Sequence, residues 1–126
     1  MEIKIENTKA AIIISNLKCV DCPGDPKMHI GFDVSFELPG YKFSTNFSEM
    51  LWDQFNVSRG SSQISDEFCH EKRLIIDRDK ISLQIKQDHD DELADMQLHF
   101  VLKVDQDRID DFKIELNAYI NYVLRN

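Results

Sequence analysis

Two neighbouring segments decide the fold of this chain: ISLQIKQ at residues 81–87 and MQLHFVLKV at residues 96–104. In both segments apolar residues occupy every second position, which is the period of a β-strand with one buried face. From residue 105 onward the apolar side chains recur every three or four positions instead. This stretch predicts two strands followed by an amphipathic C-terminal helix, whose buried side carries Ile109, Phe112, Leu116, Tyr119 or Ile120, and Val123.

Alternation of the same kind predicts four strands in the first part of the chain, at residues 2–6, 9–15, 28–38 and 41–44. Asn7-Thr8 provides the turn of a first hairpin. Pro39-Gly40 fits the centre of a type II turn, because proline fixes its own φ and glycine accepts the positive φ that follows. The strand after this turn should therefore return alongside the longest strand.

A short central helix is predicted over residues 46–60. Phe47, Leu51 and Phe55 are spaced by four, which places them on one helical face. Gly60 follows at the predicted end of the helix, where a glycine commonly adopts the left-handed conformation of a C-cap. We expect this helix to cover the same sheet as the C-terminal one.

Residues 68–77 and 81–87 are predicted to form a hairpin around Arg78-Asp79, after a polar connection over residues 61–66. The element order β-β-β-β-α-β-β-β-α over a single domain, residues 1–126, favours the α+β class. We expect one antiparallel sheet of about six to seven strands with both helices packed on one face. The expected core combines apolar residues of all these elements: Phe32, Val34, Phe36, Leu51, Phe55, Leu83, Ile85, Leu98, Phe100, Leu102, Phe112, Leu116 and Ile120.

The charge of the chain is acidic and uneven. Residues 64–126 carry fifteen acidic against nine basic residues, and so −6 of the net charge of −8. Such a surface repels nucleic acid and anionic lipid and favours a basic partner, although it also serves solubility. The longest apolar run, residues 10–14, is too short to span a bilayer, and the first residues resemble a strand more than a signal peptide. We therefore expect a cytoplasmic protein without a membrane partner.

Three cysteines leave a zinc site to be considered. Cys19 and Cys22 have the spacing of a zinc knuckle, and Cys69 with His70 could in principle complete it. Adjacent strand residues point to opposite faces, however, so Cys69 and His70 should not both bind one ion. A redox pair would need a helix after Cys19, which the proline- and glycine-rich residues 23–26 forbid. Free thiols, with no metal and no cofactor, are the expectation.

No nucleophile elbow, zinc-protease motif, P-loop or dinucleotide-binding glycine pattern occurs in the chain, so we expect no catalysis. The sharpest local feature is a run of five acids within residues 88–95. A calcium loop would need a glycine at its bend, which this run lacks. It is either a solvated loop or a docking surface for the lysines and arginines of a partner, with these candidate partner-binding residues: Asp88, Asp90, Asp91, Glu92 and Asp95.

Taken together, residues 32–124 resemble the small acidic immunity proteins of bacterial contact-dependent growth inhibition, particularly the WapI-like families. The resemblance lies in the long strand, the apolar spacing of Phe47, Leu51 and Phe55, and the three strands that close on a helix. Members often carry a tryptophan leading into the long strand, whereas the only tryptophan here is Trp52. The resemblance implies a protein without enzymatic activity that binds and blocks a toxin domain, commonly a nuclease.

The expected mechanism is occlusion, in which an acidic surface covers the basic substrate cleft of the toxin and excludes RNA or DNA. Two alternatives stay open. One is a small ligand-binding or enzymatic α+β domain with a pocket near Tyr41 and Trp52. The other is a zinc-stapled interaction module.

Overall fold

The computed structural model describes residues 2–20, 29–51, 62–65, 72–88 and 95–125. These residues form eight strands and one helix: β1 (Glu2–Glu6), β2 (Ala11–Val20), β3 (His29–Leu38), β4 (Tyr41–Leu51), β5 (Ser62–Ser65), β6 (Lys72–Ile76), β7 (Lys80–Asp88), β8 (Asp95–Lys103) and α1 (Gln106–Arg125). The α+β class is confirmed. No helix within the described residues combines the length and the apolar character needed to cross a membrane.

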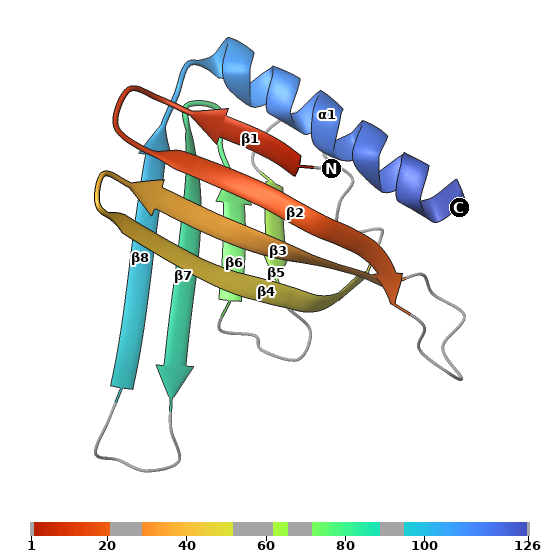
Figure 1. Ribbon diagram of the computed structural model, residues 1–126, viewed down its shortest axis with the longest axis horizontal. Helices are drawn as coiled ribbons and strands as arrows, with labels where there is room; N and C mark the ends of the chain where they lie inside the picture. Colours follow the sequence, from red (N-terminus) through yellow and green to blue (C-terminus); the bar gives the residue numbers. More distant parts are fainter. Residues whose placement is uncertain (1, 21–28, 52–61, 66–71, 89–94, 126) are drawn as a thin grey trace.

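The strands divide into two antiparallel sheets, which corrects the expected single sheet. Sheet A has the order β1-β2-β3-β4 and sheet B the order β5-β6-β7-β8, so every strand pairs with its neighbours along the chain. Figure 1 shows the strands of sheet B crossing behind those of sheet A, with α1 along one side. Each sheet has one apolar face, and packing the two faces together buries both.

One continuous core joins the two sheets and the helix. Its contact between sheets is aromatic: Phe36 of β3 stacks on Phe100 of β8 with ring centroids 4.5 Å apart. Leu98 and Phe100 lie at the margin of the core and are only partly buried, while the side chains of Leu51 and Phe55 are outside the described residues. Burial of the other expected core residues is confirmed: Phe32, Val34, Phe36, Leu83, Ile85, Leu102, Phe112, Leu116 and Ile120.

Sheet A contains the turn and the irregularities that its sequence requires. Gly40 has a φ of 76° between the paired residues Leu38 and Tyr41, as the predicted type II turn demands. Asn16 has a φ of 53° where the register of β2 against β3 shifts. Asparagine tolerates this left-handed conformation, and its Nδ2 donates to Asp33 Oδ2 at 2.7 Å.

The central helix predicted from residue 46 onward is wrong for its first six residues, because β4 continues to Leu51. A spacing of four fits one face of a helix, but it is also twice the strand period and so fits one face of a strand. Phe47 is fully buried and stacks on Phe32 with centroids 5.0 Å apart. Pairing with β3 therefore decided the structure. The rest of the predicted helix lies outside the described residues.

The predicted polar connection at residues 61–66 is also wrong in part, since residues 62–65 form β5 and pair with β6. Ile64 accounts for this strand because its side chain is completely buried. A single apolar residue between serines and a glutamine gave too little alternation to be recognised in the sequence.

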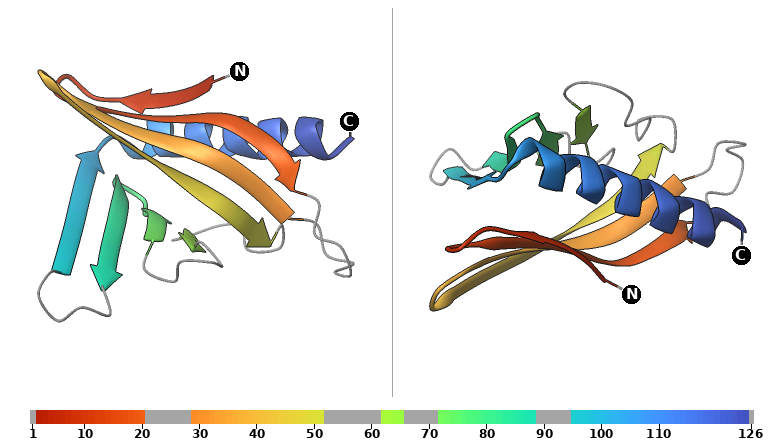
Figure 2. Two further views of the ribbon diagram at one scale, coloured as in Figure 1. Left: turned by 60° about the horizontal axis from the view of Figure 1, so that its bottom comes forward. Right: turned by 90° about the horizontal axis from the view of Figure 1, so that it is seen from above.

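Helix α1 is positioned by its cap and by the β1–β2 turn. The Asp105 carbonyl accepts hydrogen bonds from the backbone N–H groups of Arg108 and Ile109, at 3.1 and 3.2 Å, so the helix begins directly after it. Asn7 holds the predicted turn through its Oδ1 and donates from Nδ2 to the Lys103 carbonyl at 2.9 Å. Figure 2 shows α1 running beside β1 and β2 from this junction.

Candidate functional site

The acidic residues predicted to bind a partner are only partly placed. Asp88 ends β7 and Asp95 begins β8, and the two are paired in the register of these strands. The structure thus brings the two ends of the acidic run together. Asp90, Asp91 and Glu92 lie outside the described residues.

A second acidic surface lies on α1. We call it the α1 outer face and define it by its exposed residues. They recur at the helical period and form a stripe along the side of α1 that faces away from the core: Asp107, Asp110, Asp111, Ile114, Glu115, Ala118, Asn121 and Tyr122.

The α1 outer face combines negative charge with exposed apolar area. Four of its eight residues are carboxylates, and the cations within residues 107–115 are Arg108 and Lys113. Ile114, at 68% exposure, and Tyr122, at 59%, are large apolar side chains on the same stripe. The spacing of residues 107 to 122 gives it a length of about 22 Å at 1.5 Å per residue. An apolar centre within charged surroundings is the usual anatomy of a protein-binding surface.

The acids of this face are only partly explained by the stability of the helix. A carboxylate near the positive end of the helix dipole is stabilising, but the effect fades beyond the first turn. Asp107 lies in that turn. Asp111 and Glu115 lie one and two turns further on and border a groove of about 200 Å³ between α1 and β1. Lys4 and Arg108 line the same groove, and the helix dipole does not account for these two carboxylates.

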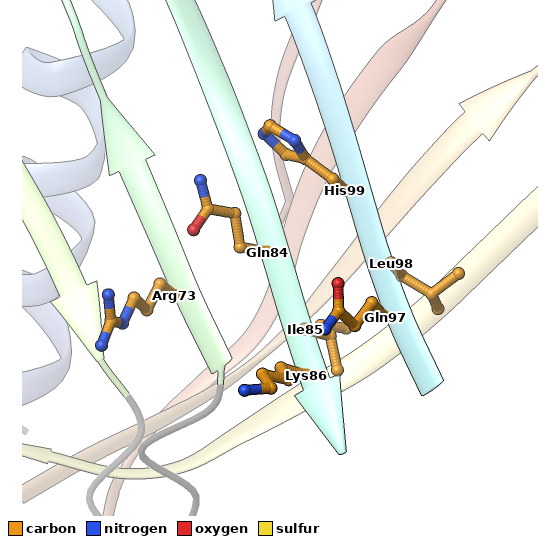
Figure 3. A pocket seen from close by; sticks show the side chains of 7 residues that line it. All are labelled: Arg73, Gln84, Ile85, Lys86, Gln97, Leu98 and His99. Carbon is orange, nitrogen blue, oxygen red and sulfur yellow. The ribbon is translucent and has the colours of Figure 1, made fainter. Parts of the chain in front are cut away.

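A depression of opposite character lies on sheet B. It has a volume of about 530 Å³ and is lined by residues of β6, β7 and β8. Arg73, Gln84 and His99 form one row across the three strands, and Lys86 and Gln97 form the next row. Figure 3 shows these five side chains on one side of the sheet, while Leu98 points to the other. Two permanently charged cations, an imidazole and two amides can attract an anionic group and donate hydrogen bonds to it.

The cysteine expectations are tested only at Cys19. Cys19 forms no disulfide and is exposed near the end of β2, and its Sγ donates weakly to the Val123 carbonyl at 3.7 Å. Cys22, Cys69 and His70 lie outside the described residues. Within the ranges that the structure does describe, no three or more metal-ligating side chains gather into a site.

Two features of these surfaces were missed in the sequence. Ile114 falls between the buried positions Phe112 and Leu116, and this departure from the apolar phase was the signal of an exposed apolar residue. The row of Arg73 and Gln84 follows from the predicted turn at residues 78–79, because positions equally far from the centre of a hairpin turn pair. The pocket expected near Tyr41 and Trp52 is not described, since Trp52 lies outside the described residues.

Comparison with family models, curated proteins and solved structures finds no match to this chain. The surfaces described above therefore carry what can be inferred about its function.

Proposed function

We propose that this protein is an immunity protein, which binds and neutralises a bacterial toxin domain and has no catalytic activity of its own. The observation that carries the proposal is the α1 outer face, where Asp110 and Asp111 lie one turn before the exposed Ile114 and Glu115 follows it directly. The toxin would present a basic substrate cleft, as nuclease domains do for their phosphate-rich substrates. Binding would then exclude RNA or DNA by covering that cleft.

The helix is a suitable docking element because its conformation is fixed before binding. A surface held in one conformation loses less conformational entropy when it binds. The inner side of α1 is fixed in the core by Phe112, Leu116 and Ile120, each at most 3% exposed. The acidic run over residues 88–95 adds to the negative charge of the chain and so, in the proposal, to the long-range attraction of the partner.

A second candidate is the binding of a small anion in the depression on sheet B. Arg73, Lys86 and His99 favour it, because together they offer positive charge and hydrogen-bond donors on one face. The depression is open and lies on the outside of the sheet, with the core filled behind it. We place it second, because a basic depression of this kind suits an anion and not the basic partner expected for the acidic chain.

The test compares three charge variants in binding to the protein encoded immediately upstream, since immunity genes normally follow their toxins. The helix variant carries Asp107→Asn, Asp110→Asn, Asp111→Asn and Glu115→Gln. The loop variant carries Asp88→Asn, Asp90→Asn, Asp91→Asn and Glu92→Gln. The control variant carries Arg73→Gln and Lys86→Gln.

We expect the helix variant to lose at least about tenfold in affinity, or about 1.4 kcal/mol, together with growth protection. The loop variant should mainly slow association, in a way that depends on salt, because exposed charges act over about 8 Å at physiological ionic strength. The control variant should bind as well as the wild type. Unchanged binding in both acidic variants would contradict the proposed surface, and a loss confined to the control variant would indicate that the partner contacts the depression on sheet B instead.

A further inference from the structure

The four sheet edges of this fold differ in how they are protected. Unpaired backbone N–H and C=O groups along an edge strand attract another strand, so folded proteins shorten, bend or cover such edges. The edge strands here are β1 and β4 of sheet A, and β5 and β8 of sheet B. Three of them carry an identifiable protection.

Strand β1 has five residues and α1 beside it, and Arg108 donates to its Glu6 carbonyl. Strand β5 has only four residues. Strand β4 is longer, but its register against β3 shifts between Ile30 and Phe32, and Lys72 Nζ donates to its Asn46 carbonyl at 3.0 Å. These edges are therefore short, covered or irregular.

Among the residues that the structure describes, none gives β8 such protection over most of its length. It has nine residues, contains neither proline nor glycine, and keeps an unbroken register against β7. Asn7 occupies only the carbonyl of its last residue, Lys103. Figures 1 and 2 both show β8 at the outer margin of sheet B. Apart from Lys103, every second residue of β8 thus directs its backbone groups to a side on which no described strand pairs.

Apolar side chains accompany this edge on both sides of the sheet. Tyr41 is 49% exposed, and its ring lies 6.4 Å from that of Phe100. Leu38, paired with Tyr41, and Val101 on the opposite side of β8 are also exposed. Large apolar groups beside a regular free edge are a typical site of strand addition.

We propose that β8 pairs with the β8 strand of a second copy of this chain, antiparallel and about a two-fold axis at His99. The product is a symmetric dimer with one continuous eight-stranded sheet, four strands from each copy. Residue 99 is the midpoint of β8, so this register pairs the two strands along their length except at Lys103, whose carbonyl accepts from Asn7. A two-fold axis perpendicular to the sheet keeps the inner side chains on the inner face in both copies.

The side chains of β8 complement themselves in this register. Leu98 faces Phe100 of the second copy on the inner side, where both are only partly buried in one chain. Gln97 faces Val101 on the outer side. Lys103 faces position 95, which the sequence fills with aspartate. Apolar and opposite-charge pairs across antiparallel strands stabilise a sheet, and this match favours a second copy over an unrelated strand.

The first test is the mass of the full chain in solution by sedimentation equilibrium, which should show a dimer. His99→Lys places two like charges opposite each other across the axis and should weaken the dimer at least tenfold. Gln84→Lys is the matched control, because it adds the same charge in the same row but one strand further from the edge. Mixing the His99→Lys chain with a His99→Glu chain should restore a dimer of the two.

The second test traps the dimer covalently and does not depend on a loss of stability. Opposite residues of antiparallel strands have Cα atoms about 4.5 to 5.5 Å apart, which a disulfide can bridge. With all three native cysteines replaced by serine, His99→Cys should form a disulfide-linked dimer under mild oxidation, whereas Gln84→Cys should not. The proposal would be overturned if the wild type is a monomer. It would also be overturned if the dimer persists in the His99→Lys variant and the His99→Cys variant forms no disulfide between chains. Neither test involves the α1 outer face, so the dimer proposal and the proposed function can be refuted independently.

Discussion

The two faces of α1 share one helix but differ in almost every property. The inner face is apolar and closes the core against β1 and β2, with Phe112 only 3% exposed. The α1 outer face is acidic, and Ile114, two residues from Phe112, is 68% exposed. Both faces follow the same helical period, so they differ because one side of the helix packs on the core and the other is exposed.

If the α1 outer face binds the partner as proposed, stability and binding depend on opposite sides of one helix. Apolar burial on the inner face is the main source of stabilisation, because it removes large side chains from water. Exposed charges on a helix contribute only a few tenths of a kcal/mol through their neighbours. Substitutions on the outer face should therefore change what the protein binds without unfolding it.

The largest expected effect is on the inner face. Phe112→Ala should lower the free energy of unfolding by about 3 to 5 kcal/mol, because it leaves a cavity in the core. Ile114→Ala is the matched control and should change it by less than about 0.5 kcal/mol, as exposed positions do. Urea denaturation followed by circular dichroism measures both. A loss below about 1 kcal/mol for Phe112→Ala would mean that the inner face is not the buried one.

Much of this fold was predictable from alternation and turn chemistry. The β1–β2 hairpin, the turn at Gly40 and the hairpin around residues 78–79 are confirmed. So is the C-terminal helix after Asp105. These elements were predictable because local sequence and tertiary packing favour the same structure in each of them.

The errors arose where local sequence was compatible with two structures. Phe47 and Leu51 fit a helix or a strand equally well, and pairing with β3 selected the strand. The division into two sheets depends on whether β4 pairs with the following strand, which no local pattern reports. Of the predicted partner-binding residues, only the positions of Asp88 and Asp95 in the strands are described.

A smaller effect is expected where an exposed residue of α1 ties the helix to sheet A. Arg108 donates from Nη1 to the Glu6 carbonyl at the end of β1. A hydrogen bond from a charged donor contributes more to stability than one from a neutral donor. For this exposed bond we expect Arg108→Ala to lower the free energy of unfolding by roughly 1 kcal/mol. Arg78→Ala, which removes an exposed arginine from the β6–β7 turn, should change the unfolding free energy by less than about 0.5 kcal/mol. Equal effects of the two substitutions in urea denaturation would show that the Arg108 contact does not hold the helix.

The smallest effect is expected at the other end of α1, where Cys19 approaches Val123. A thiol is a weak donor, and the distance of 3.7 Å from Sγ to the carbonyl is long. The group is also exposed, so water can replace the contact. Cys19→Ser combined with Cys22→Ser should therefore leave the midpoint of thermal unfolding nearly unchanged, both with and without a chelator. The opposite result would be one equivalent of zinc in the wild type, with both zinc and folding lost in the double variant. It would show that the cysteines hold a structural metal and that burial under α1 is not sufficient to stabilise the fold.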